Sequence, residues 1–274
     1  MDAPASHQHA PSSLRPLLRV GEEDPHAAYR TLINEVPVAL VFNGTTLAVM
    51  MASPLQIDDF AIGFALSEGY IQRRSDIEEL DIVPHPTGIE ARFWVVEACA
   101  EALRDRRRAT LGPIGCGLCG IESLDQAIRD VPPVTSSQRI SVADLERAFG
   151  DLRKHQRLHD ETRSCHAAGF FHAEHGLAFC REDVGRQNAL DKIIGAVATS
   201  GLDPESGAIL MTSRLSVELI QKAATVGFPL LAGVSGPSAL AVELAQEAGM
   251  TLLGFCKGRS FDVFSGPERV TLDR

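Results

Sequence analysis

The sequence predicts an α/β protein whose N-terminal part is of the α+β type. From residue 186 onward, segments with helical and strand-like patterns alternate, which is typical of a sheet with parallel neighbours covered by helices. Before residue 132, strand-like segments come in pairs around a predicted helix, so that part is expected to be α+β. Between the two parts, Val131–Gln138 contains Pro132, Pro133 and two serines and is interpreted as a linker.

The N-terminal elements follow from turn residues and helix boundaries. Asn43-Gly44, a favoured pair for a two-residue hairpin turn, joins two apolar segments rich in valine. Asp58 and Asp59 precede an apolar helical face that Gly69 closes, which predicts a helix between them. The predicted strands are Leu17–Val20, Pro37–Phe42, Thr45–Met51, Ile77–Val83 and Ile89–Cys99.

The C-terminal elements are predicted in the same way. Ser141 is expected to cap a helix that runs to about Lys154, with Asp144 as a partner of the capping-box kind. Further helices are predicted at about Arg186–Ala198, Val217–Thr225 and Ser238–Ala248. The predicted strands are Ala167–His172, Leu177–Arg181, Ala208–Thr212, Pro229–Val234 and Thr251–Cys256.

Composition and charge narrow the class of protein. The chain has 274 residues, of which 45% are hydrophobic and 23% are charged, close to the values of soluble globular proteins. The formal net charge of −10 makes a broad basic surface for nucleic acid unexpected, although a local basic pocket for a small anion remains open. No apolar run reaches about 18 residues, so no membrane-spanning helix is expected.

The N-terminal segment 1–16 is rich in Ala, Ser, Pro and His and is expected to be a disordered tail. It lacks the basic start and apolar segment of a secretory signal, so a cytoplasmic location is expected. In that compartment cysteines are expected to be reduced thiols. The six cysteines are Cys99, Cys116, Cys119, Cys165, Cys180 and Cys256.

The most unusual segment is the glycine-rich stretch from Gly112 to Gly120, which holds Cys116 and Cys119 as a CxxC pair. Glycine leaves the thiols uncovered and the backbone free to move. Four interpretations remain open: half of a zinc site completed by Cys165-His166, a thioredoxin-like redox pair, a sulfur relay through a persulfide, and a glycine loop with incidental cysteines. The stretch also has the spacing Gly-x-Gly-x-x-Gly, but no predicted strand precedes it, so a dinucleotide fingerprint is rejected.

A second candidate site lies where the predicted C-terminal strands end. In an open α/β sheet, ligands bind at the carboxyl ends of the strands, and helix N-termini there favour phosphate. Ser, Gly and Arg at successive junctions suit a pyrophosphate, but the same residue types are ordinary helix caps and turns. The junction residues are Thr212, Ser213, Arg214, Ser216, Ser235, Gly236, Ser238, Lys257, Gly258 and Arg259.

Three further features allow a functional and a structural interpretation. His166 precedes a predicted strand, where it is either an acid, base or ligand, or a structural residue. Glu182 and Asp183 precede a predicted helix, where the helix dipole favours carboxylates whatever their function. The basic run Arg104–Arg108 is either a solvated face or a docking patch for an acidic partner near the CxxC pair.

Taken together, several blocks of this sequence resemble the FdhD/NarQ family, whose members are sulfur carriers required for formate dehydrogenase activity. The resemblance covers about Pro37 to Val270, and the combination of blocks is specific where no single block is. The blocks are Asp59–Phe64 with Ser67-Glu68-Gly69, Cys116–Gly120, Thr162 with His166–Ala168, Glu182–Arg186 with Asn188–Lys192, and Ser213–Ser216 continuing through Gly254-Phe255-Cys256.

The resemblance implies a sulfurtransferase. It would take sulfur from a cysteine desulfurase and deliver it to the molybdenum cofactor carrying two molybdopterin guanine dinucleotides, before that cofactor enters the catalytic subunit of formate dehydrogenase. The active cysteine of the family falls on Cys116, with Cys119 assisting. The residues implied in cofactor binding are Phe255, Cys256, Lys257, Gly258, Arg259, Ser260, Ser213, Arg214, Ser235 and His166.

The resemblance also implies an architecture. An α+β domain at 17–131 would end in the CxxC loop, and a cytidine-deaminase-like three-layer α/β sandwich at 132–274 would bind the cofactor in a homodimer. Zinc deaminases use His-x-Glu followed by Pro-Cys-x-x-Cys, whereas Ala167 and Ala168 follow His166 here. No resident metal is therefore expected.

The sequence departs from the family pattern at Arg163, Gln187, Ser213 and Gly236. These departures affect the assignment of the ligand-binding residues more than the assignment of the reactive thiols. Two alternatives to a sulfurtransferase remain open: a cofactor-binding chaperone that moves no sulfur, and a zinc-dependent nucleotide deaminase-like enzyme.

Overall fold

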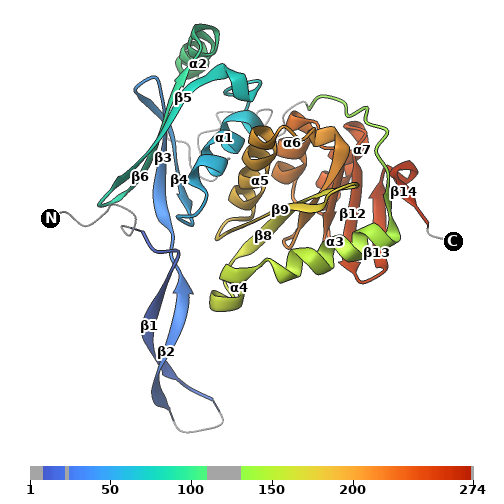
Figure 1. The fold of residues 1–274 in the computed structure, drawn as a ribbon, viewed down its shortest axis with the longest axis horizontal. Coiled ribbons are helices and arrows are strands. Elements are labelled where there is room, and N and C mark those ends of the chain that lie inside the picture. Colours follow the sequence, from blue (N-terminus) through green and yellow to red (C-terminus); the bar gives the residue numbers. More distant parts are fainter. Residues whose placement is uncertain (1–8, 22–24, 110–130, 273–274) are drawn as a thin grey trace.

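The computed structural model describes residues 9–21, 25–109 and 131–272. Figure 1 shows a smaller sheet and a larger sheet with helices packed between them, and a long hairpin that projects from the smaller sheet. Within these described ranges, no helix is long and apolar enough to cross a bilayer. The predicted fold class, α/β with an α+β N-terminal part, is confirmed as a mixed α/β fold.

A four-stranded sheet with the order β4-β3-β6-β5 forms most of the N-terminal part. The predicted hairpin is confirmed: β3 (Val36–Phe42) and β4 (Thr45–Ala52) pair in antiparallel fashion. Asn43 and Gly44 join them with φ angles of 44° and 78°, the left-handed backbone that a two-residue hairpin turn requires. Alternate residues of β3 are buried, so one face of this sheet belongs to the core.

The last predicted N-terminal strand ends earlier than expected. β6 (Gly88–Val95) pairs with β5 (Ile77–His85) and runs parallel to β3. The chain then forms the helix α2 (Glu97–Ala109), so the prediction that Cys99 ends a strand is wrong. A short apolar segment is compatible with a strand or with a helix. Here the Val96 carbonyl accepts the first helical hydrogen bonds, from the amides of residues 99 and 100.

The projecting hairpin consists of β1 (Ser12–Arg19) and β2 (His26–Ile33), which pair along their whole length (Figure 1). The predicted tail at 1–16 is therefore wrong for residues 12–16, because these residues have a strand partner. The predicted strand at Leu17–Val20 is the end of β1. Polar residues and alanines interrupt the apolar pattern of β2, and no prediction was made for it.

The larger sheet has six strands in the order β13-β12-β11-β10-β8-β9. Its centre is parallel, as the alternation predicted: β10 (Gly207–Met211), β11 (Leu230–Gly233) and β12 (Thr251–Lys257) run in one direction. Antiparallel neighbours flank this centre. They are β8 (His166–His172), which pairs with β9 (Gly176–Asp183), and β13 (Ser260–Ser265), which pairs with β12.

Helices cover both faces of the larger sheet. The helices α5 (Arg186–Ser200), α6 (Val217–Val226) and α7 (Ala239–Glu247) share one core with alternate residues of β10, such as Ile209 and Met211. The helix α3 (Val142–Lys154) covers the opposite face with Leu145, Ala148 and Leu152 (Figure 1). The predicted cap of α3 is confirmed, since the Ser141 hydroxyl accepts from the Asp144 amide.

Short elements complete the described chain. The helix α4 (Arg157–Thr162) leads into β8 and was not predicted. The short strands β7 (Ile140–Ser141) and β14 (Val270–Thr271) pair in parallel, and single-turn helices lie at Arg74–Asp76, Pro204–Ser206 and Pro267–Arg269.

The two sheets are joined through the helix α1 (Ile57–Ser67), which packs against α5 (Figure 1). The two helices cross at glycines. A Cβ on Gly63 would overlap the Asp191 carbonyl, and a Cβ on Gly195 would overlap the Asp59 carbonyl. Backbone therefore meets backbone at this crossing, and no larger residue fits at either position.

Candidate functional site

Three loops meet where the parallel strands of the larger sheet end. Because β10, β11 and β12 are parallel, residues 212–216, 234–238 and 258–259 follow them at the same edge, here called the carboxyl edge. Hydrogen bonds tie the loops together. The Leu215 amide donates to the Gly236 carbonyl over 3.2 Å, and the Phe255 amide donates to the Ser235 carbonyl over 3.3 Å.

The antiparallel strands bring further predicted residues to this edge. β8 runs against β10, so its first residue, His166, lies beside the end of β10, where the Ala167 amide donates to the Thr212 hydroxyl over 2.8 Å. His166 also opposes Asp183, the last residue of β9. Arg186 then begins α5, and its Nε donates to the Ser216 Oγ over 3.3 Å.

The chemistry offered at the carboxyl edge is cationic and polar. Arg214 and Lys257 are exposed and form no ion pair with any residue in the described ranges. Arg259, also exposed, lies 3.8 Å from the Glu146 carboxylate of α3. Burial and the nearby Arg186 lower the pKa of His166, so its imidazole is neutral at pH 7. Together with the N-termini of α6 and α7, these groups suit an anionic ligand.

Phe255 has an unusual backbone at this edge. Its φ of 54° is rare for a bulky residue, and its side chain is 55% exposed. The ring lies against Gly236, where an added Cβ would overlap it. The glycine that departs from the family pattern at position 236 thus leaves room for an aromatic ring that is held out toward solvent.

Not every predicted binding residue is exposed at the carboxyl edge. Cys256 is buried in the core on the α3 side of the sheet, and Ser213 is buried with its hydroxyl donating to the Arg214 carbonyl over 3.0 Å. Lys257 and Ser260 oppose each other at the start of the β12–β13 turn, so Gly258 and Arg259 form its tip. The structure therefore gathers His166, Ser235, Arg214 and Phe255 at the edge, whereas Cys256 and Ser213 support the backbone there.

The four cysteines in the described ranges all have raised pKa values, although only Cys256 is buried and the other three are partly exposed. Burial raises the pKa of Cys180 and Cys256 to about 12. Burial and the Glu182 carboxylate raise the pKa of Cys165 to about 12. Burial, with help from Asp76, raises the pKa of Cys99. A thiol is nucleophilic as the thiolate, so none of these four suits sulfur transfer at neutral pH.

The predicted catalytic pair, Cys116 and Cys119, lies outside the described residues, as does the rest of the glycine-rich stretch. The side chains of Arg104–Arg108 also lie outside the described part. Among the side chains that are described, no three His, Cys, Asp or Glu residues are grouped in a way that would hold a metal ion.

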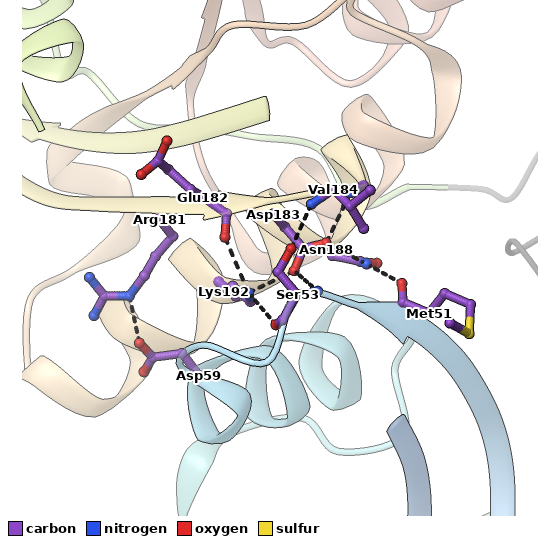
Figure 2. A network of polar contacts seen from close by, with 10 residues as sticks. Met51, Ser53, Asp59, Arg181, Glu182, Asp183, Val184, Asn188 and Lys192 are labelled. Atoms are coloured by element: carbon purple, nitrogen blue, oxygen red, sulfur yellow. Dashed lines mark hydrogen bonds and ion pairs between the residues drawn. The ribbon is translucent and has the colours of Figure 1, made fainter. Parts of the chain in front are cut away.

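A second polar cluster joins the two sheets, and Figure 2 shows it from close by. The Lys192 Nζ lies 2.6 Å from the Asp183 Oδ2, and both side chains are completely buried. The lysine also donates to the carbonyls of Ser53 and Glu182 over 3.1 and 3.2 Å. Asp183 accepts from the amides of Ser53 and Gly185 and from the Asn188 side chain, so every charge in the cluster has several partners.

Three further ion pairs lie along the same junction. The Arg181 Nε lies 2.7 Å from the Asp59 Oδ2 (Figure 2). The Lys222 Nζ lies 3.0 Å from carboxylate oxygens of both Glu68 and Asp191. Burial raises the pKa of Asp191 to about 6. Burial would lower the pKa of Lys222, but the two carboxylates outweigh it and raise this pKa.

Several residues of the family blocks form the contacts of the junction. Asp183, Asn188 and Lys192 hold the C-terminal part to the end of β4, and Asp191 holds α5 to α1 and α6. The sequence did not predict that these residues contact one another across the junction. A signal was present in the charged residues at Asp191 and Lys192, within an otherwise apolar predicted helix, because buried charges require partners.

The comparisons with known proteins cover the same part of the chain. A model of the FdhD/NarQ family matches residues 33–271. The chain belongs to the FdhD/NarQ family. The predicted resemblance is thus confirmed, and both the carboxyl edge and the junction lie within the matched residues.

Curated members of the FdhD/NarQ family match over most of their length. Sulfur carrier protein FdhD of Agrobacterium fabrum (strain C58 / ATCC 33970) is 46% identical over 252 residues, which cover 92% of this chain and 93% of the relative. Sulfur carrier protein FdhD of Bordetella bronchiseptica is 42% identical over 254 residues, covering 93% and 90%.

A solved structure shares the fold of this FdhD/NarQ chain. It is a crystal structure of a protein from Desulfotalea psychrophila that is described as a formate dehydrogenase accessory protein. The TM-score is 0.77 at 22% sequence identity, and the match covers 96% of this chain and 100% of that chain. At this identity the match supports the fold alone.

Proposed function

We propose that this chain is a sulfur carrier that accepts sulfur on Cys116, with Cys119 assisting, and delivers it to a bound molybdenum cofactor needed by formate dehydrogenase. Family membership and the names of the relatives support the sulfur-carrier role. The donor would be a cysteine desulfurase, and the client would be the catalytic subunit of a formate dehydrogenase. The protein would act in the cytoplasm as a homodimer.

The observation that carries this proposal is the state of the other cysteines. Of the six cysteines in the chain, the four in the described ranges have raised pKa values. Sulfur chemistry is then left to Cys116 and Cys119, which stand among glycines in the sequence. No carboxylate lies within two residues of Cys116 in the sequence to disfavour a thiolate there.

The proposed transfer proceeds through a persulfide. The Cys116 thiolate attacks the outer sulfur of the persulfide on the donor, a new S–S bond forms, and the donor cysteine leaves as a thiolate. The terminal sulfur is then passed to the acceptor. Cys119 would release it by forming a disulfide with Cys116, or would shield the persulfide before delivery.

The acceptor, as substrate, would lie at the carboxyl edge. A cofactor with two guanine dinucleotides carries phosphates and flat bases. Arg214 and Lys257 would attract the phosphates, the N-termini of α6 and α7 would donate backbone hydrogen bonds to them, and the exposed Phe255 ring would stack on a base. The cytidine-deaminase-like sandwich expected at 132–274 would thus serve as a nucleotide cradle, and the domain at 17–131 would present the thiols.

The decisive test is persulfide formation. Purified full-length protein would be incubated with a cysteine desulfurase and cysteine, and each thiol would be examined by mass spectrometry for one added sulfur atom. We expect the sulfur on Cys116, its loss in Cys116→Ala, and its retention in the control Cys180→Ala, which removes a thiol with a raised pKa. A wild-type protein that never gains sulfur would favour a cofactor-binding chaperone, and stoichiometric zinc in the purified protein would favour the deaminase-like alternative.

A further inference from the structure

Two polar side chains of the helix α6 lack partners in the described part of the chain. The Oε2 of Glu218 and the Nε2 of Gln221 are buried, and neither atom forms a hydrogen bond with a described residue. Gln221 as a whole is only 8% exposed. A buried polar group without a partner is destabilising. An acceptor and a donor left in this state together indicate a ligand that supplies the missing partners.

The cation that would suit Glu218 is engaged elsewhere. Glu218 and Lys222 stand four residues apart with the glutamate first, which is the favoured arrangement for an ion pair on a helix. The Lys222 Nζ instead lies 3.0 Å from carboxylate oxygens of both Glu68 and Asp191. It also donates to the Ser67 hydroxyl over 2.9 Å. The lysine thus serves the junction, and Glu218 forms no ion pair with any residue in the described ranges.

Both side chains belong to the end of α6 that starts at the carboxyl edge. The helix begins at Val217, directly after the loop 212–216 of that edge. Residues three apart share one face of a helix, so Glu218 and Gln221 lie one above the other. Helical side chains lean toward the N-terminus of their helix, and Gln221 follows Val217 by only about 6 Å along the axis. The two unpartnered groups are therefore within reach of a ligand bound at the carboxyl edge.

The two groups together match one kind of ring. A carboxylate only accepts hydrogen bonds, and a glutamine amide can donate through its nitrogen. The pyrimidine ring of guanine carries an amino group, a ring N–H and a carbonyl oxygen in a row, and the ring of a pterin carries the same row. Its two donors match the Glu218 carboxylate, and its carbonyl oxygen matches the Gln221 amide. Adenine has an accepting ring nitrogen where guanine has the N–H, so the carboxylate would repel it.

We infer that Glu218 and Gln221 recognise the amino-oxo-pyrimidine ring of the bound cofactor. Glu218 accepts from the amino group and the ring N–H, and Gln221 donates to the carbonyl oxygen. The inference rests on the proposed function, because the cofactor named there contains this ring in its guanines and in its pterins. The two side chains then determine which ring is bound, whereas Arg214 and Lys257 supply a positive charge that would attract the phosphates of any nucleotide.

Binding of two probes to the full-length protein tests the inference. GDP carries the guanine ring, and neopterin carries the pterin ring without a phosphate. Calorimetry should show that the affinity for at least one of them falls about tenfold in Glu218→Gln and in Gln221→Met, because each variant loses a hydrogen bond to a buried group. A fall for GDP assigns the guanine, and a fall for neopterin assigns the pterin. ADP, which lacks this ring, should bind the variants no more weakly than it binds wild type.

The matched control is Glu243→Gln, which removes an exposed carboxylate from α7 and should leave all three affinities unchanged. Circular dichroism would verify that each variant is folded. The inference is overturned if wild type binds neither GDP nor neopterin, if either variant binds both probes as wild type does, or if the affinity for ADP falls as much as that for the probes. Persulfide formation on wild type needs the thiols but no ring, so it tests the proposed function separately.

Discussion

The junction between the sheets and the carboxyl edge are built from the same sequence blocks, yet their charged residues behave differently. At the junction Lys192 and Asp183 are completely buried and surrounded by partners from two sheets. At the edge Arg214 is exposed and Phe255 is 55% exposed. Charged residues of the family blocks are thus buried and paired at the junction, whereas Arg214 at the edge is exposed and has no ion-pair partner among the described residues.

The block from Glu182 to Arg186 shows this division within five residues. Glu182 accepts from the amides of Leu158 and His159 at the start of α4, and Asp183 belongs to the junction. Arg186 instead contacts Ser216 at the carboxyl edge. The side-chain alternation of a strand followed by a helix start sends neighbouring residues to different regions of the molecule.

The largest effect should come from breaking the junction. Lys192→Met leaves the Asp183 carboxylate buried without its cation, and the free energy of unfolding should fall by about 3–5 kcal/mol. Urea denaturation would measure it. The control Lys154→Met removes an exposed pair with Asp151 and should cost less than about 1 kcal/mol. Equal losses in the two variants would mean that the junction is not the stronger region.

An intermediate effect should come from the helix crossing. Gly195→Ala forces α1 and α5 apart at the Asp59 carbonyl, and overpacking of this kind costs about 1–3 kcal/mol. The matched control is Gly150→Ala in α3, where an added Cβ has open space. The control should be neutral or more stable by up to about 1 kcal/mol, because alanine favours a helix over glycine. An unchanged Gly195→Ala protein would contradict the close crossing.

A substitution at the carboxyl edge should have the smallest effect on stability. It should instead weaken ligand binding. Arg214→Ala should change the free energy of unfolding by no more than about 0.5 kcal/mol. Its affinity for GDP, used as a probe of the guanine dinucleotide, should fall about tenfold because a charge-assisted contact is lost. Calorimetry would measure both affinities, and the control Arg139→Ala removes an exposed arginine away from the carboxyl edge. The comparison separates the loss of this contact from the loss of one positive charge. Equal affinities in both variants would remove Arg214 from the site.

Much of the C-terminal part could be predicted because local signals agreed with the fold. Ser141 with Asp144 marked the start of α3, and the alternation after residue 186 marked the parallel centre of the sheet. The projecting hairpin could not be predicted, since β2 lacks the strict apolar alternation that marks a strand with one face in the core. Cys99 was misplaced because a short apolar segment fits both a strand and a helix.

The candidate site was predictable in its residue types and less so in their roles. Ser213 and Cys256 occur at the expected junctions, but whether such a side chain faces solvent or core depends on strand register and bulges, which a sequence pattern leaves open. Two ion pairs of the junction join residues more than 120 positions apart: Asp59 with Arg181, and Glu68 with Lys222. No local pattern contains these pairings.

The glycine crossing of α1 and α5 also has a mechanical consequence. Because main chain rests on main chain at Gly63 and Gly195, no compressible side chain lies between the helices to absorb a displacement. α5 begins at Arg186, where the candidate ligand would bind, and α1 is continuous with the smaller sheet. A displacement of α5 would therefore be passed directly to α1 and not be absorbed between the two helices.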